Sequence, residues 1–275
     1  MLILEYEPRT TIPVELDGLI PSALRDQSTA DVQRRLVFHG KEQVPLAELF
    51  RVAGSAADDR IELRGDPSGV HRIGAGMDGG EIHVAGSAGR HLGSEMTAGR
   101  ITVEGDAGDW LGAQLHGGLI HVHGRAGDAV GAAYRGSPRG MTGGTILVDG
   151  PVGNEAARNM RRGLVAVGAA GDAVGYGLLA GTVLVFGPCG TRPGANMRRG
   201  TIGLFGPTTT TLLPTFRYGC RLRPTFLSLV LRDLARLGYP FDERLLSAAY
   251  DLYHGDFLEL GRGEILVPSH LAGAG

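Results

Sequence analysis

Lysine is almost absent from this sequence of 275 residues, and cysteine and aromatic residues are scarce. Lys41 is the single lysine among 27 basic residues, and the net charge of -2 offers no basic field for nucleic acid. The two cysteines, Cys189 and Cys220, have the spacing of neither a disulfide framework nor a zinc site. Because the sequence has no apolar run of membrane-spanning length and residues 1–20 do not resemble a signal peptide, we expect a cytoplasmic protein that contacts neither membrane nor nucleic acid.

Glycine, by contrast, is in large excess, with 46 residues of the 275. Of these glycines, 36 fall within residues 60–206, where they alternate with Ile, Val and Leu. They do not recur at every third position, which excludes collagen, and the aliphatic residues between them exclude a flexible linker. This composition predicts a repeat that is built from tight turns and short strands.

The repeat has a period of about 19 residues. In each unit a methionine or leucine stands three residues before a glycine, and these apolar residues are Met77, Met96, Leu115, Met141, Met160, Leu178 and Met197. Their successive spacings are 19, 19, 26, 19, 18 and 19. The spacing of 26 equals one period plus a seven-residue insertion at 134–140.

A unit of this size cannot bury its apolar face alone, but it can do so when stacked on its neighbours, as in a parallel β-helix. Apolar triplets such as Ile82-His83-Val84 place the first and third side chains inward and the middle one outward. A left-handed β-helix would repeat an aliphatic residue every six positions, whereas Ile82 is followed by Ala88 and then Ser94. We therefore expect a mainly β fold, a right-handed parallel β-helix of about eight coils.

The segments on either side of the repeat have a different composition. The sequence thus divides into an N-terminal cap at 1–57, the β-helix at 58–206 and a C-terminal extension at 207–275. Within the cap, residues 31–36 and 45–52 are predicted to form short helices. Such a cap would cover the open sheet edge that the first coil exposes.

The C-terminal extension is predicted to contain two short amphipathic helices. The first follows Pro224, and the second begins at Asp242 as its N-cap and ends at Gly255. Two interpretations stay open for this extension. It either folds back as a cap on the end of the β-helix or forms an arm that docks on another subunit.

Histidines on the outward face are the first candidates for a metal site. His83 and His121 share one outward column but lie two coils apart, about 9.6 Å, which is too far for both to bind one zinc ion without large side-chain convergence. His123 lies in the next outward column, between Glu104 and Asp149. A ladder of surface ion pairs explains this arrangement, and a metal or acid/base site is the alternative.

Nothing in the sequence predicts catalysis by this chain. It has no G-x-S-x-G elbow, and neither cysteine has a histidine neighbour. The Gly-x-x-Gly segments lack the Lys-Ser/Thr of a phosphate-binding loop and follow from the 19-residue period. We therefore expect no catalytic, cofactor-binding or metal-binding residue in the chain.

Two arginine-rich features are candidate contacts for a partner or an anion. The sequence Asn-Met-Arg-Arg-Gly occurs at 159–163 and again at 196–200, and the insertion at 134–140 protrudes from the repeat. Guanidinium groups suit carboxylates, on a partner subunit or on a polyglutamate cofactor, whereas solvated turns are the alternative. The candidate residues are Tyr134, Arg135, Arg139, Arg161, Arg162, Arg198 and Arg199.

The repeat, with its Gly-Met-x-Gly-Gly-x-Ile-x-Val core, resembles the glycine-rich β-helix of glutamate synthase C-terminal domains and of the C subunit of formylmethanofuran dehydrogenases. The second resemblance extends from about Arg35 to Gly206. The insertion and the following Met141 resemble the Tyr-Arg-Gly-x-x-Arg-Gly-Met stretch of that protein, and His71-Arg72-Ile73-Gly74 resembles the lead-in to its first full coil. A glutamate synthase would need a far longer chain with an amidotransferase nucleophile at its start.

This resemblance implies a non-catalytic scaffold subunit. The tail at 212–263 looks like the bacterial form of the family, whose complex transfers a formyl group from formyl-tetrahydromethanopterin to a methanofuran analogue and hydrolyses it to formate during formaldehyde oxidation. The implied partners are companion subunits A, B and D, with zinc bound in one of these companions. The alternatives are the C subunit of a molybdenum or tungsten formylmethanofuran dehydrogenase and a stand-alone β-helix that binds a polymer or acts on carbohydrate.

Overall fold

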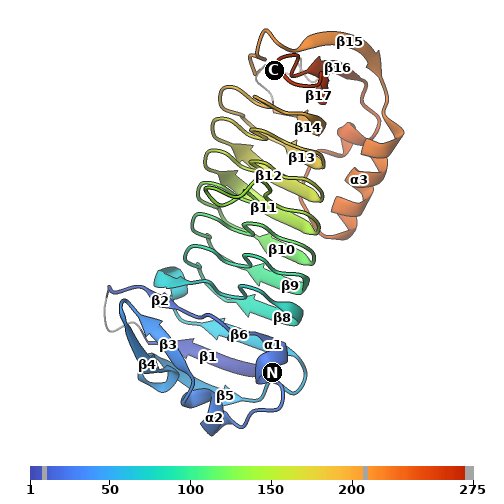
Figure 1. Ribbon diagram of the computed structural model, residues 1–275. Helices are drawn as coiled ribbons and strands as arrows, with labels where there is room; N and C mark the ends of the chain where they lie inside the picture. Colours follow the sequence, from blue (N-terminus) through green and yellow to red (C-terminus); the bar gives the residue numbers. More distant parts are fainter. Residues whose placement is uncertain (8–10, 207–209, 270–275) are drawn as a thin grey trace.

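The protein is mainly β in a computed structural model that describes residues 1–7, 11–206 and 210–269. Most strands belong to one sheet of 13 strands, in the order β15-β16-β17-β14-β13-β12-β11-β10-β9-β8-β6-β1-β5. Figure 1 shows these strands stacked in a column, with the N-terminal segments at one end and the C-terminal segments at the other. A second sheet has the order β4-β3-β2-β7 and lies in the N-terminal part.

Eight strands of the glycine-rich region pair in parallel and follow their order in the chain. They are β6 (Arg60–Arg64), β8 (Asp78–Val84), β9 (Ala98–Val103), β10 (Leu119–Val122), β11 (Thr145–Val152), β12 (Leu164–Ala170), β13 (Thr182–Val185) and β14 (Arg199–Leu204). The register places Ile82 beside Ile101, and the same inward column continues through every later strand. Each unit therefore adds one strand, as the 19-residue period predicts.

A second row of contacts joins the units on their return paths. Isolated parallel bridges link Ala88 to Ala107, Ala107 to Ala126, and Ala126 to Val152. The methionines and leucines of the repeat are fully buried and belong to one core cluster. The apolar core thus runs along the inside of the whole stack, where each unit is covered by its neighbours.

The regular spacing of methionine and glycine within the repeat has a steric cause, which Gly99 illustrates. Its φ of +96° lies in the region that L side chains rarely adopt, and a Cβ there would lie 2.6 Å from Met77 Cε and 2.7 Å from the Gly80 carbonyl oxygen. Gly118 repeats this arrangement against Met96. The glycine of one unit therefore makes room for the methionine of the unit before it.

Segments from the N-terminal flank close one end of the large sheet. Strand β1 (Leu2–Tyr6) pairs in parallel with β6, and β5 (Phe50–Gly54) pairs antiparallel with β1. The remaining N-terminal elements are β2 (Val14–Glu15), α1 (Pro21–Leu24), α2 (Thr29–Gln33), β3 (Leu36–His39), β4 (Glu42–Pro45), η1 (Leu46–Glu48), η2 (Pro67–Gly69) and β7 (Val70–His71).

The two helices predicted in the cap are only partly present. Residues 31–36 hold the end of α2 and the start of β3, and residues 45–52 hold one short 3-10 turn followed by the start of β5. The prediction of helix was wrong for the residues of β3 and β5. These segments form strands because they pair with β4 and β1, and the local sequence pattern does not reveal those partners.

The C-terminal extension agrees with its prediction in the first half only. Helix α3 (Thr225–Arg236) follows Pro224 as predicted. The prediction of a second helix was wrong. After the short 3-10 segment η3 (Glu243–Leu246), the chain forms β16 (Tyr250–Gly255) and β17 (Arg262–Pro268). These strands, with β15 (Arg217–Leu222), extend the large sheet beyond β14 and cover its open edge.

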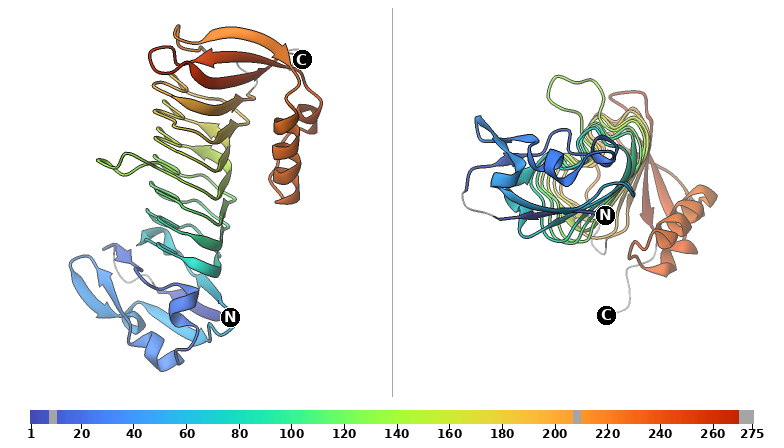
Figure 2. Two further views of the ribbon diagram at one scale, coloured as in Figure 1. Left: turned by 45° about the vertical axis from the view of Figure 1, so that its right-hand side comes forward. Right: turned by 90° about the horizontal axis from the view of Figure 1, so that it is seen from below.

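Helix α3 folds back along the outward face of the sheet, as Figure 2 shows. Its buried residues Leu227, Leu231 and Leu234 join one apolar cluster with the outward-facing Leu147 and Leu184 of the strands. The middle residues of the later strands are therefore buried as well, because their sheet is covered on both faces. The strands β15 to β17 at the end of the stack agree with the first interpretation, a cap on the end of the repeat, whereas α3 lies along its side.

No helix within the described ranges has the length and the apolar character needed to cross a lipid bilayer.

Candidate functional site

The outward face of the sheet carries a group of histidines and carboxylates on its uncovered half. On β8, His83 Nε2 lies 2.8 Å from a carboxylate oxygen of Glu104 and His83 Nδ1 lies 3.9 Å from Glu62. Further along the sheet, His121 and His123 stand two residues apart and point to the same face. Imidazoles and carboxylates therefore alternate along this face from β6 to β11.

Asp149 joins the last two histidines in one cluster. The pairing of His121 with Leu147 places Asp149 beside His123 on the neighbouring strand. His121 Nε2 lies 2.8 Å from Asp149 Oδ1, and His123 Nδ1 lies 2.7 Å from Asp149 Oδ2. The two imidazole rings are 4.3 Å apart at their centroids. One carboxylate thus meets both imidazoles, each through a separate oxygen.

The cluster lies where the covered and the uncovered parts of the sheet meet. Only 7% of the His121 side chain is exposed, because Tyr239 from the segment after α3 packs beside it. The Tyr239 hydroxyl donates a hydrogen bond to the Val148 carbonyl oxygen, and burial raises the pKa of Tyr239. His123 keeps 39% of its side chain exposed, so the cluster opens to solvent on that side.

The sequence predicted part of this arrangement. His123 does lie against Asp149, but Glu104 pairs with His83 instead, and His83 and His121 bind different carboxylates. The contact between His121 and Asp149 was not predicted. The signal that could have revealed it is the pair of histidines at i and i+2, with an aspartate opposite the second one in the next unit.

The insertion is anchored through Tyr134, the first of its predicted contact residues. The Tyr134 hydroxyl lies 3.0 Å from His91 Nδ1, and its ring packs 5.1 Å from that of Trp110. Burial raises the pKa of Tyr134. Arg135 and Arg139 are exposed, and Arg135 lines a pocket of about 320 Å³ together with acidic residues of the neighbouring units. The insertion therefore presents its arginines to solvent while the tyrosine holds its base.

The two arginine pairs lie where the chain enters strands β12 and β14, two strands apart in the sheet, and Arg199 is the first residue of β14. All four guanidinium-bearing side chains are exposed, and the N–H at Arg198 Nε donates to Glu259 at 3.2 Å. Within the described residues, Arg161, Arg162 and Arg199 form no ion pair. Their charge is therefore available to an external carboxylate.

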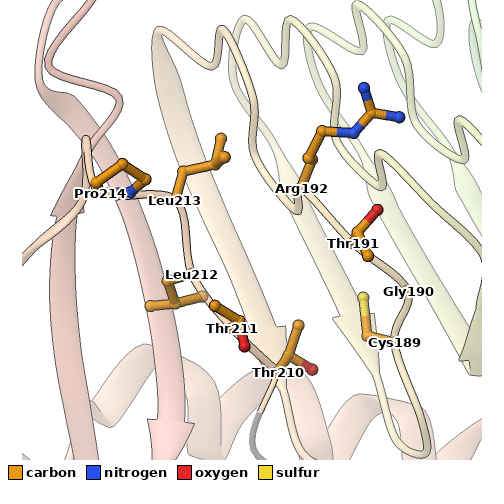
Figure 3. A pocket seen from close by; sticks show the side chains of 9 residues that line it. All are labelled: Cys189, Gly190, Thr191, Arg192, Thr210, Thr211, Leu212, Leu213 and Pro214. Carbon is orange, nitrogen blue, oxygen red and sulfur yellow. The ribbon is translucent and has the colours of Figure 1, made fainter.

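A pocket of about 430 Å³ lies between the last repeat units and the segment that follows them (Figure 3). Thr191 and Arg192 line one side of it, and Leu212 and Leu213 line the other. Burial raises the pKa of the Cys189 thiol in this pocket to about 11. Because the thiol is protonated at neutral pH, Cys189 is not an activated nucleophile.

His71 is expected to make the fold sensitive to acid. The backbone N–H of Arg90 donates a hydrogen bond to His71 Nδ1 at 3.0 Å, and burial followed by the Arg90 charge lowers the pKa of His71. In the unfolded chain His71 has a pKa of about 6.5, so the unfolded chain binds more protons than the folded protein as the pH falls. The contribution of neutral His71 to stability is therefore complete above pH 6.5 and is lost as the pH falls below it. In His71→Asn, the Oδ1 atom can accept the same hydrogen bond without titrating.

We therefore expect the unfolding temperature of the wild type to fall more steeply between pH 7 and pH 5 than that of His71→Asn. The measurement is thermal unfolding followed by circular dichroism in a pH series. His116→Asn is the matched control, because His116 Nδ1 faces the Thr142 hydroxyl, which can either donate or accept. Parallel pH profiles for the wild type and His71→Asn would contradict the prediction.

Comparison with known proteins identifies the family. No family model matches the chain. Over 84 residues the chain is 37% identical to the C subunit of the molybdenum-containing formylmethanofuran dehydrogenase 1 of Methanosarcina barkeri, a match that covers 29% of this chain and 28% of that protein. Over 90 residues it is 36% identical to the C subunit of the tungsten-containing formylmethanofuran dehydrogenase 2 of Methanothermobacter thermautotrophicus, covering 31% of this chain and 33% of that protein. The matched segments thus span about a third or less of these relatives.

A solved structure extends the similarity to nearly the whole chain. It is a crystal structure of the formyltransferase/hydrolase complex (FhcABCD) from Methylorubrum extorquens in complex with methylofuran. The match has a TM-score of 0.91 and 33% identity, and it covers 98% of this chain and 100% of that chain. This chain belongs to the family of formylmethanofuran dehydrogenase C subunits. The resemblance to this family that the glycine-rich repeat indicated is therefore confirmed. The relatives of this chain include C subunits of both molybdenum and tungsten enzymes.

Proposed function

We propose that this chain is the non-catalytic scaffold subunit of a formyltransferase/hydrolase complex. The complex would transfer a formyl group from formyl-tetrahydromethanopterin to a methanofuran analogue and hydrolyse it to formate. The carriers and the catalytic zinc would bind to the companion subunits A, B and D. A cytoplasmic location is part of the proposal, and the two free cysteines Cys189 and Cys220 agree with it.

The observation that carries this proposal is the end-to-end match to a chain of the FhcABCD complex. The match includes the flanks, in which α3 and the strands β15 to β17 depart from the repeat. A scaffold role also fits the chemistry of the described residues. The thiol of Cys189, which is only partly exposed, is protonated at neutral pH and is therefore not an activated nucleophile.

We further propose that the stacked units form a right-handed parallel β-helix over residues 58–206, between an N-terminal cap at 1–57 and the extension at 207–275. The parallel register from β6 to β14 and the second row of bridges support this architecture. Each unit adds about 4.8 Å, the spacing between paired strands, so the eight strands span roughly 34 Å from first to last. A rod of this kind has a fixed register, which suits it to hold companion active sites at a set separation.

A second candidate function is that of the C subunit in a molybdenum or tungsten formylmethanofuran dehydrogenase. The identities of 37% and 36% to two such proteins favour it, although they cover less than a third of this chain. The two candidates differ in the companions that they require. A dehydrogenase would bring a molybdenum or tungsten protein, whereas the hydrolase would bring none.

Purification of the native complex tests the proposal. We expect the tagged full-length chain to bring down three companion proteins, identified by mass spectrometry, and the preparation to hydrolyse the formylated carrier. A metal assay by plasma mass spectrometry should find zinc without molybdenum or tungsten. Recovery of molybdenum or tungsten would support the second candidate. Recovery of this chain alone, monodisperse and active on a sugar polymer, would overturn both.

The arginine pairs are proposed contacts to acidic groups of a companion protein or of the polyglutamate part of a carrier. Close charge pairs in protein interfaces contribute about 1.5–7 kcal/mol each, so replacing Arg161, Arg162, Arg198 and Arg199 by Glu should weaken assembly or carrier binding by at least about 100-fold. Analytical ultracentrifugation of the complex and carrier titration measure the two effects. A matched control reverses four other exposed arginines, Arg60, Arg90, Arg100 and Arg232. Equal behaviour of the two variants would rule out the proposed contacts.

A further inference from the structure

The geometry of His121, His123 and Asp149 points to a metal site, and we propose that these three side chains bind a divalent cation of the zinc class. One imidazole nitrogen from each histidine and one carboxylate oxygen all lie within 4.8 Å of one another. In a tetrahedral zinc site with bonds of about 2.0–2.1 Å, neighbouring ligand atoms are roughly 3.3 Å apart. In the proposed site, side-chain rotations would bring the three donors to that separation.

The backbone holds the three donors on one face without depending on a flexible loop. His121 belongs to β10, His123 directly follows it, and Asp149 belongs to the adjacent β11. Parallel pairing fixes the register between these strands, since His121 is opposite Leu147 and Val122 is opposite Val148. The Tyr239 ring lies on the covered side, with its centroid 6.5 Å from that of the His121 ring. A site on paired strands loses little conformational entropy when a metal binds.

The ligand set selects the class of ion. Two imidazoles and one carboxylate suit zinc and related transition metals, whereas calcium and magnesium prefer sites made of oxygen alone. The exposed side of His123 provides the entry path and the place for a water molecule as the fourth ligand. The carboxylate of Glu104, which the sequence placed beside His123, is occupied by His83 at 2.8 Å.

The present contacts also show what the metal would replace. Asp149 uses Oδ1 toward His121 and Oδ2 toward His123, so each imidazole nitrogen that faces it is within hydrogen-bond distance of a carboxylate. A cation at the centre of the cluster would take the lone pairs of both nitrogens and of the carboxylate. Metal binding would therefore release any proton shared in these contacts.

The test is a titration of the full-length chain, freed of its tag and of bound metal, with zinc chloride. We expect one zinc ion per chain by isothermal titration calorimetry. Cobalt(II) should compete for the same site and give the visible absorption bands of a four-coordinate ion. Nitrogen-15 NMR of the histidine side chains should show shifts at His121 and His123, an assignment that needs no substitution.

Variants then locate the site. His123→Gln and Asp149→Asn should each lower zinc affinity by at least about tenfold, because even the loss of an outer-shell partner of a metal ligand costs about 10–100-fold. His83→Gln is the matched control, because this histidine also meets a carboxylate on the same face but lies outside the cluster. Its affinity should stay unchanged. Failure of the wild-type chain to bind zinc, or equal binding by a folded His123→Gln/Asp149→Asn double variant, would overturn the proposal.

Discussion

Replacing Gly99 by alanine is expected to destabilise the protein by about 2–6 kcal/mol, the sum of backbone strain and overpacking. At a φ of +96° any side chain is strained, and the new Cβ would lie 2.7 Å from the Gly80 carbonyl oxygen. The Met77 methyl group could move away, but the Gly80 carbonyl is part of the backbone of β8 and cannot shift as freely as the end of a side chain. The measurement is the free energy of unfolding of the full-length chain in urea.

Two other glycines separate the contributions to this effect. Gly136 has a φ of +87° but open space around its Cβ position, so Gly136→Ala should show the backbone strain alone, about 1 kcal/mol or slightly more. Gly79 has neither a positive φ nor a close neighbour, so Gly79→Ala should change stability by less than about 0.5 kcal/mol. Equal losses for Gly99→Ala and Gly136→Ala would show that close approach between units does not matter.

The repeat could be predicted from the sequence because each of its constraints is local. A glycine is needed wherever the chain turns against the previous unit, and an aliphatic residue is needed wherever the strand points inward. Both requirements recur at the same spacing, so Ile82, Ile101 and Ile120 could be aligned before the pairing was known. Strand order and register then follow from the chain order of the units.

The flanks could not be predicted to the same extent, because their pairing is not local. Leu245, Leu246 and Leu252 fit a helical period, yet the chain over Tyr250–Gly255 forms β16 between β15 and β17. Tertiary pairing thus overrides the local pattern, as it does for β3 and β5 in the cap. No signal within these short segments reveals a partner that lies elsewhere in the chain.

The histidine cluster could be predicted from the sequence only in part. The repeat alignment places Asp149 beside His123, and the structure confirms that contact. The contact of His121 with the same carboxylate is diagonal across the strands and depends on side-chain rotamers, which the alignment does not define. The burial of His121 further depends on Tyr239, a residue about 118 positions away in the chain.

The sequence of the repeat contains a signal for the covering of the sheet by α3. The outward middle positions change from His83 and Thr102 in the early units to Leu147 and Leu184 in the later ones. Apolar residues at outward positions indicate that something covers them, and α3 supplies a matching face. The interpretation as a cap concerned the end of the repeat, so this cover along its outward face was not predicted.

Replacing Leu231 by alanine is expected to cost about 2–5 kcal/mol, because the change leaves a cavity in a well-packed cluster. Leu231 is fully buried between α3 and the strands, in the cluster that includes Leu147, Ala166 and Leu184. Since β8 and β9 contribute no residue to that cluster, the loss should concentrate in the C-terminal half. Hydrogen exchange followed by mass spectrometry measures where stability is lost. Relative to the wild type, we expect a larger increase in the exchange rate in α3 than in β8 and β9.

Leu229 on the same helix provides the matched control for this prediction. Its side chain is 57% exposed, so Leu229→Ala should change the free energy of unfolding by less than about 0.5 kcal/mol. Both substitutions remove the same atoms from the same helix and alter its intrinsic propensity equally. Any difference between them therefore measures the packing of α3 on the sheet. Equal exchange rates in the two variants would contradict a helix that is held in place by its own chain.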